Sequence, residues 1–225
     1  MFELIIFDCD GVLVDSELLS AQATAKAITE YGIPMDQQMA LKLFTGITLT
    51  KSLSVIERQF GVQLGSDYLQ RKAELTAIEF RKHLKPIPGI EALLNSLKVP
   101  FCLGSNSTHP RLEVTLDSVN LTPYFVDQVH SADDVEHGKP APDLFLFAAN
   151  RNNVSPDKCL VIDDSPTGIK AATAAGMSSI GFIGGTHVGP EQADKLRSEG
   201  AKWIMSSHQE VSQLIKSLET PRIAI

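Results

Sequence analysis

Asp8 and Asp10 are the residues of this sequence best placed to do chemistry, because they end an apolar run, Leu4 to Phe7, that predicts a buried strand. Residues two apart on an extended backbone point to the same side, so both carboxylates share one face. Carboxylates that lose hydration together repel each other unless a cation lies between them or one keeps a proton. We therefore predict a metal site or a proton-transfer pair at the carboxyl end of this strand.

Three further polar segments lie after or between other apolar runs. Ser105 and Asn106 follow one run, and Asp163 and Asp164 follow another. Lys139 lies between them in a loop stiffened by two prolines. Each segment alone has a plain explanation as a turn, a helix cap or a solvated lysine. Because ligands bind at the carboxyl ends of strands in open α/β sheets, we expect all the segments to converge on one site.

The residue types in these segments suit phosphoryl-group chemistry. Carboxylates without a thiolate or histidine cluster favour a hard cation, so Mg²⁺ is expected rather than zinc. The hydroxyl and backbone N–H groups at Ser105 and Asn106, together with the ammonium of Lys139, suit an anion. A metal, a lysine and a hydroxyl can bind a phosphoryl group and spread its charge in the transition state. One carboxylate can then attack phosphorus while a second moves protons.

The elements that must position these residues alternate between short apolar runs and helical segments. This alternation predicts an α/β fold, a Rossmann-like parallel sheet core with helices on both faces. Strands are expected at residues 3–8, 99–104, 125–131, 160–162, 179–183 and 203–205. Helices are expected at residues 89–98, 110–119, 143–150, 167–175, 190–197 and 208–218. The Gly-Gly-Thr-His segment at residues 184–187 follows a strand and is expected to line the same edge.

A purely helical stretch of about 65 residues interrupts this alternation after the first strand. Its helices are expected at residues 17–31, 35–44, 48–60 and 66–83. We predict an inserted all-helical cap domain at residues 16–84, and a catalytic core formed by residues 1–15 and 85–225. An insert that begins beside a carboxylate cluster is placed to act as a lid.

Composition excludes several classes of partner. The 225 residues include 27 acidic and 20 basic ones, which gives a net charge of −7, and no run of Lys and Arg is present. We therefore expect no nucleic-acid partner and no binding to acidic membranes. No apolar run approaches the roughly 20 residues of a membrane span, and the N-terminus lacks the pattern of a signal peptide.

Cysteine usage bears on the compartment. Cys9, Cys102 and Cys159 are odd in number, and each lies in an apolar run. They are expected to be free core residues in a reducing compartment, which predicts a cytoplasmic protein.

The ordered motifs resemble those of the haloacid dehalogenase (HAD) superfamily, in its branch with a small helical cap, over the whole chain. The matching segments are Asp8 to Ser16, Ser105-Asn106, Lys139 in Gly-Lys-Pro-Ala-Pro-Asp, and Asp163-Asp164-Ser165 with Gly168. The resemblance implies that Asp8 is the nucleophile and Asp10 the general acid/base. It implies that Asp8, the Asp10 carbonyl and Asp164 hold Mg²⁺, with Asp163 nearby. It further implies that Ser105 and Lys139 hold the phosphoryl group.

The resemblance also bears on the reaction. The presence of Asp10 favours phosphoryl transfer over halide displacement. The pattern is most similar to phosphatases acting on sugar phosphates such as 6-phosphogluconate, through an aspartyl phosphate. The alternative is a mutase like beta-phosphoglucomutase, but Ser20 and Leu49 stand where that subgroup has a cap-hinge histidine and a cap arginine. A phospho-aspartate receiver or a catalytically idle binding protein is the third reading.

The cap is expected to select the substrate, a small phosphorylated metabolite. Glu17 near the hinge, Gly46 in a break between helices, and Lys72 are the predicted cap contacts, with Asn106 contributing from the core. Lys72 also fits an ordinary helix-surface lysine. Asp15 is interpreted as a flap or hinge residue. The expected assembly is a monomer or a weak homo-oligomer.

Overall fold

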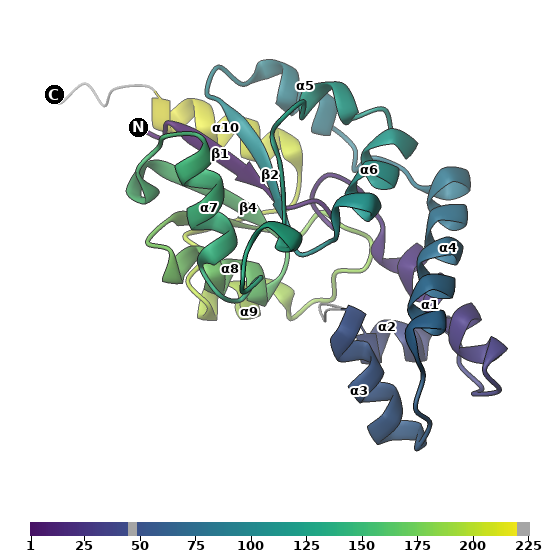
Figure 1. Cartoon of the computed structure of the whole chain (residues 1–225). Helices are drawn as coiled ribbons and strands as arrows, with labels where there is room; N and C mark the ends of the chain where they lie inside the picture. The colour runs from purple at the N-terminus through teal and green to yellow at the C-terminus, as the bar shows by residue number, and fades with distance from the viewer. Residues whose placement is uncertain (45–48, 220–225) are drawn as a thin grey trace, which may run out of the picture.

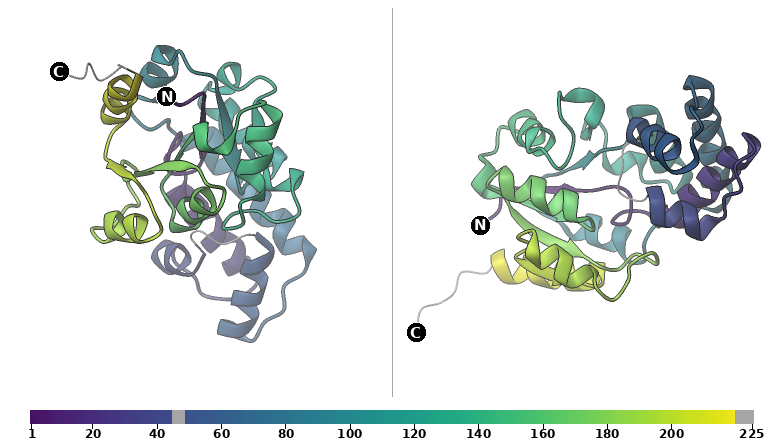
Figure 2. Two further views of the ribbon diagram at one scale, coloured as in Figure 1. Left: turned by 90° about the vertical axis from the view of Figure 1, so that its left-hand side faces the viewer. Right: turned by 90° about the horizontal axis from the view of Figure 1, so that it is seen from below.

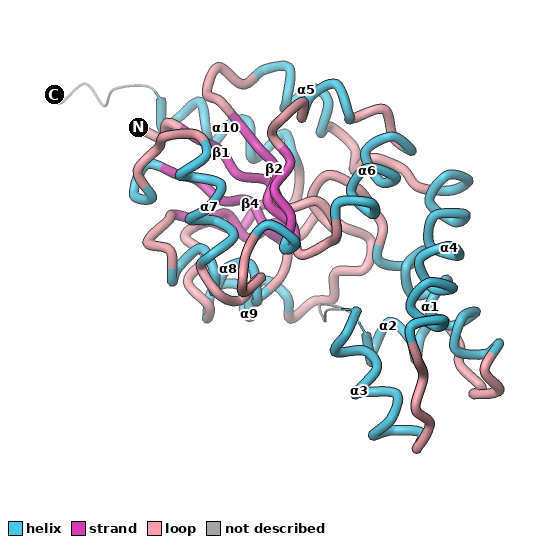
Figure 3. Tube along the Cα trace, viewed as in Figure 1, coloured by secondary structure: helices cyan, strands magenta, loops and turns pink. Residues whose placement is uncertain are grey.

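A six-stranded parallel sheet forms the centre of the protein, seen in a computed structural model that describes residues 1–44 and 49–219 (Figures 1 and 3). The strand order is β3-β2-β1-β4-β5-β6, so the strand that carries Asp8 lies inside the sheet. The strands are β1 (Leu4–Phe7), β2 (Phe101–Ser105), β3 (Val129–Ser131), β4 (Cys159–Asp163), β5 (Ser178–Phe182) and β6 (Trp203–Met205).

Alternate residues of β1 supply the two faces of the sheet, as the pleat of a strand requires. Ile5 and Phe7 pack in a cluster with helices α5 (Ile90–Ser96), α6 (His109–Ser118) and α10 (His208–Glu219). Leu4 and Ile6 pack on the opposite face with α7 (Asp143–Arg151) and α8 (Pro166–Ala174). Helix α9 (Gln192–Ser198) contacts β5 and β6. All four β1 side chains are buried, which explains the continuous apolar run.

Four helices follow β1 and form a separate group beside the sheet (Figures 1 and 2). They are α1 (Glu17–Glu30), α2 (Gln37–Phe44), α3 (Leu49–Phe60) and α4 (Ser66–His83). These helices share a hydrophobic cluster of their own, centred on the fully buried Ile28, Ile56 and Tyr68. This cluster is separate from the two that cover the sheet, which supports the predicted division into core and cap, whose boundaries stay a prediction.

The predicted fold class is confirmed, and one strand differs. The sheet strand expected at residues 125–131 begins only at Val129. A short 3₁₀ helix at Thr122–Tyr124 and a turn with Asp127 at φ 56° precede it. A positive φ is incompatible with a continuous strand, and Phe125 is buried from the turn instead.

The three cysteines lie in the interior of the protein. Cys9, Cys102 and Cys159 are free and buried. Among the described residues, no helix combines the length and the apolar character that a membrane crossing requires.

Candidate active site

Lys139 joins two carboxylates at the carboxyl end of the sheet. Its Nζ lies 2.7 Å from Asp8 Oδ1 and 2.8 Å from Asp163 Oδ2. Asp8 directly follows β1 and Asp163 ends the neighbouring β4, and the Asp8 N–H donates to the Ile162 carbonyl at 2.9 Å. Parallel pairing of β1 with β4 therefore brings two distant motifs together.

Asp8, Asp163 and Asp164 form a buried group of oxygen donors. One carboxylate oxygen from each lies within 4.8 Å of the others. A Cβ on Gly11, which has φ +79°, would overlap the Asp164 carboxylate. Glycine therefore permits the first loop to approach this group closely. The three buried carboxylates outnumber the one ammonium group nearby, that of Lys139. Oxygen donors without sulfur are the ligands that fit Mg²⁺.

Burial and crowding raise the pKa of two of these carboxyls. For Asp8, burial raises the pKa well above its usual value; the Lys139 ammonium opposes the rise, and Asp163 and Asp164 add to it. For Asp164, burial raises the pKa against the hydrogen bond from His187. Lys139 itself stays charged because Asp163 and Asp8 outweigh the effect of burial and raise its pKa. An added cation would stabilise the ionised carboxylates.

Asp10 has a different environment from Asp8. Its Oδ1 accepts from Ser16 and from Arg111, the latter at 3.1 Å, and its Oδ2 accepts from Ser107 Oγ at 2.8 Å. Burial acts to raise the pKa of Asp10, but the Arg111 charge and the three hydrogen-bond donors outweigh it, so the pKa is lowered. The two aspartates that look alike in sequence are thus held by different partners.

Hydrogen bonds join the second motif, Ser105-Asn106, to the third motif at Lys139. The Asn106 side chain accepts from the Lys139 N–H at 2.8 Å and donates to the Lys139 carbonyl at 3.0 Å. These bonds hold the backbone of Lys139 and occupy the amide of Asn106. Ser105 is buried, and its Oγ accepts from the Ser107 N–H at 3.2 Å. Ser105 therefore lies two residues before Ser107, the serine that binds Asp10.

The predicted cap contacts Glu17 and Lys72 have perturbed acidities. Burial, with the charges of Asp10 and Asp164, raises the pKa of Glu17 to about 7. Burial, with the charge of Arg111, lowers the pKa of Lys72 to about 8, against the effect of Glu17. The charges of Asp10 and Asp164 therefore act on Glu17, whereas the charges that act on Lys72 are those of Arg111 and Glu17. Gly46, the third predicted cap contact, lies outside the described residues.

Arg111 and His187 also belong to the site; the sequence predicted only that the segment containing His187 lines this edge. Arg111 lies on α6, six residues after Ser105, where a single helix arginine carries no recognisable signal. His187 Nε2 lies 3.0 Å from Asp164 Oδ2. His187 belongs to the segment at residues 184–187, whose position after a strand was the available signal.

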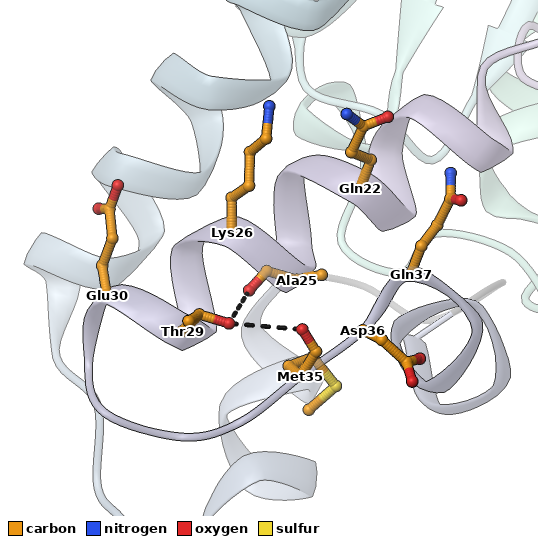
Figure 4. A pocket seen from close by; sticks show the side chains of 8 residues that line it. All are labelled: Gln22, Ala25, Lys26, Thr29, Glu30, Met35, Asp36 and Gln37. Atoms are coloured by element: carbon orange, nitrogen blue, oxygen red, sulfur yellow. Dashed lines mark hydrogen bonds between the residues drawn. The ribbon is translucent and has the colours of Figure 1, made fainter.

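A separate hollow of about 410 Å³ lies on the cap (Figure 4). Its lining includes Gln22, Lys26 and Glu30 of α1 and Met35 of the connection to α2. The Thr29 hydroxyl, which also lines the hollow, donates to the carbonyls of Ala25 and Met35 at 2.8 and 3.4 Å. No carboxylate of the cluster lines this hollow, so the chemistry is assigned to the sheet edge.

A haloacid dehalogenase-like hydrolase family model matches residues 2–176. The chain belongs to the haloacid dehalogenase-like hydrolase family. It is 32% identical over 190 residues to the 6-phosphogluconate phosphatase of Escherichia coli, and the match covers 84% of this chain and 86% of that relative. It is also 32% identical over 177 residues to a fructose-1-phosphate phosphatase of the same organism, and this match covers 78% of this chain and 94% of that relative.

A solved structure supports the same family membership. A conserved haloacid dehalogenase-like protein of unknown function from Agrobacterium tumefaciens has a TM-score of 0.83 at 38% identity, and the match covers 98% of this chain and 100% of that chain. The family and the enzyme class predicted from the motifs, a phosphatase-type hydrolase, are confirmed by these matches.

Proposed function

We propose that the protein is a Mg²⁺-dependent phosphatase that hydrolyses a small sugar phosphate through an aspartyl phosphate on Asp8. The observation that carries the proposal is the division between the two aspartates. Asp8 lies with Lys139 and the other cluster carboxylates, whereas Asp10 is held apart by Arg111, Ser16 and Ser107. One carboxylate is therefore available for attack and the other for proton transfer.

Asp8, Asp164 and the Asp10 carbonyl would hold Mg²⁺, with Asp163 nearby. When bound, the ion would neutralise charge on the phosphoryl oxygens. Lys139 supplies a fixed positive charge between Asp8 and Asp163, so it can steady both the nucleophile and an incoming phosphoryl group. The Ser105 hydroxyl and nearby N–H groups would bind the phosphoryl oxygens.

The reaction divides into two displacements. In the first, a bond forms between an Asp8 oxygen and phosphorus while the bond to the sugar oxygen breaks, and Asp10 gives that oxygen a proton. In the second, Asp10 takes a proton from water as the water attacks phosphorus and releases Asp8. The lowered pKa of Asp10 suits the second displacement directly. In the first displacement, the carboxylate must take up a proton before it can donate one.

The cap residues support a polar, hydroxyl-bearing leaving group. Glu17 and Lys72 offer one acceptor and one cation beside Arg111. The relatives that act on 6-phosphogluconate and fructose 1-phosphate support a sugar phosphate. Three free buried cysteines support the predicted cytoplasmic location.

The mutase alternative has less support from the cap hinge. Ser20 replaces the histidine expected there, and its hydroxyl lies 3.5 Å from Arg111 Nη1. A serine cannot act as a proton shuttle near neutral pH in the way a histidine can.

A panel assay tests the proposal. Purified protein with Mg²⁺ would be given 6-phosphogluconate, fructose 1-phosphate, glucose 1-phosphate, phosphoglycolate and a nucleoside monophosphate, and free phosphate would be measured. We expect release from at least one hexose-derived ester, with the highest kcat/KM in that class. Interconversion of glucose phosphates without phosphate release, in the presence of a bisphosphate primer, would instead establish a mutase. Activity confined to the nucleotide would remove the sugar-phosphate assignment.

A further inference from the structure

Thr186 and His187 lie in the loop between β5 and α9, beyond the segment that the family model matches, residues 2–176. This loop nevertheless enters the site. His187 Nε2 lies 3.0 Å from Asp164 Oδ2, and the side chains of both residues are at most 10% exposed. The imidazole therefore contacts a carboxylate of the cluster in a largely dry environment.

Thr186, the residue before His187, binds Asp15 in the connection to the cap. The Thr186 hydroxyl donates to Asp15 Oδ2 at 2.7 Å, and the Thr186 N–H donates to Asp15 Oδ1 at 3.3 Å. Asp15 lies two residues before the start of α1 at Glu17. Two adjacent residues thus hold one carboxylate of the cluster and one carboxylate of the connection to the cap.

His187 also lies against the first loop. A Cβ on Gly11 would come 3.0 Å from His187 Cε1, in addition to overlapping the Asp164 carboxylate. The imidazole therefore closes the space between Asp164 and the loop that runs from Asp10 to the hinge. Its Nδ1 is buried and has no hydrogen-bond partner among the described residues. The ring is accordingly held by packing and by its single bond to Asp164.

Residues that hydrogen-bond to a metal-ligating carboxylate fix its orientation and alter metal affinity, commonly by 10- to 100-fold. We propose that Thr186 and His187 form a positioning clamp: His187 orients Asp164 for the divalent cation, and Thr186 ties that same loop to Asp15 at the cap hinge. The clamp couples occupancy of the metal site to the order of residues 11–17. The inference rests on the metal site of the proposed function, but not on the identity of the substrate.

The first test measures metal binding without turnover. Mn²⁺ binding followed by electron paramagnetic resonance, with Mg²⁺ competition, would compare the wild type with His187→Asn and Thr186→Val. We expect the dissociation constant to rise about 10-fold or more for His187→Asn and by a smaller factor for Thr186→Val. His137→Asn is the matched control, because His137 is exposed and pairs with Asp143 at 3.3 Å. A dissociation constant unchanged in both clamp variants would overturn the proposal.

The second test measures coupling to the hinge. Hydrogen exchange of residues 11–17 would be compared with and without Mg²⁺. In the wild type we expect Mg²⁺ to slow exchange in this segment, and in Thr186→Val we expect the slowing to be lost while the metal still binds. Equal slowing in the wild type and Thr186→Val would remove the coupling. Circular dichroism would establish that each variant is folded. Metal binding without any phosphatase activity would contradict the proposed function and leave the clamp supported.

Discussion

Arg111 Nη2 lies 3.1 Å from Asp10 Oδ1, although the two residues are 101 positions apart in the chain. The same guanidinium lies over the Phe80 ring of α4, with 5.2 Å from its central carbon to the ring centroid, and reaches Ser20 of α1. Arg111 thus contacts Asp10, the proposed proton-transfer carboxylate, and two cap helices at once. Burial opposes its charge, but Asp10 and Glu17 outweigh that effect and raise its pKa.

Replacing Arg111 with methionine is expected to lower kcat by about 100-fold, because a misoriented acid/base loses much of the 10²- to 10⁴-fold that such groups contribute. Steady-state kinetics would measure kcat, and Arg111→Lys should restore part of it. Arg81→Gln, an exposed arginine of α4, is the control. A kcat within twofold of the wild type in Arg111→Met would show that Asp10 needs no such partner.

Asp8→Asn is expected to reduce phosphate release by about a thousandfold or more, because an amide cannot replace the attacking carboxylate. The melting temperature at pH 7 should not fall. Burial raises the pKa of Asp8, so its ionised form destabilises the fold at neutral pH, and the neutral amide removes that cost. Differential scanning calorimetry and a phosphate assay would measure the two quantities. Asp194→Asn, on an exposed residue of α9, is the control; substantial turnover by Asp8→Asn would exclude Asp8 as the nucleophile.

The sequence was sufficient to predict the sheet and the carboxylate cluster, because both depend on local patterns. Buried parallel strands are short apolar runs, and motif residues directly follow β1, β2 and β4. Arg111 could not be found in the same way, since its importance comes from the packing of α6 against α4. The strand was predicted to begin at Phe125 because this residue is apolar, but a residue can be buried without lying in extended backbone. The cap contacts depend on tertiary contacts between distant helices, which no local spacing encodes.

Two glycines with similar φ angles allow the cost of backbone strain to be measured separately from the cost of a steric clash. Gly11 has φ +79° and faces Asp164, whereas Gly176 has φ +74° and nothing within 4 Å of an added Cβ. Gly176→Ala should cost about 1–2 kcal/mol of stability from the left-handed backbone alone. Gly11→Ala should cost more and should also weaken Mg²⁺ binding, because the methyl group displaces the Asp164 carboxylate. Urea unfolding and metal titration would measure both effects; equal costs and unchanged metal binding would contradict the close approach of the first loop.

Lys72 should impart a pH dependence to substrate binding. Its pKa is lowered to about 8, first by burial and then by Arg111, so the ammonium is present below that pH and lost above it. If Lys72 binds the sugar portion or an acidic group on it, KM should rise as the pH increases from 7 to 9.5. Lys72→Met should raise KM at pH 7 and remove the dependence, and Lys72→Arg should shift it to higher pH. Lys82→Met, on an exposed lysine of α4, is the control; a flat wild-type KM would exclude Lys72 as a contact.

The hydrophobic cluster shared by α1 to α4 is distinct from the two clusters that cover the sheet. Ile28, Ile56 and Tyr68 lie in the cap cluster alone, whereas Phe80 of α4 packs in the same cluster as Ile5 and Phe7 of β1. Substitutions around the first three residues are therefore expected to change the cap with less effect on β1 than substitutions of Phe80. Residues that determine the choice of substrate can consequently mutate separately from residues that carry out the chemistry. A new leaving group could be accepted through changes around Ile28, Ile56 and Tyr68, while Phe80, whose ring contacts the Arg111 guanidinium, stays unchanged. In evolutionary terms, the division of hydrophobic packing makes this protein a scaffold on which specificity can diversify at little risk to turnover.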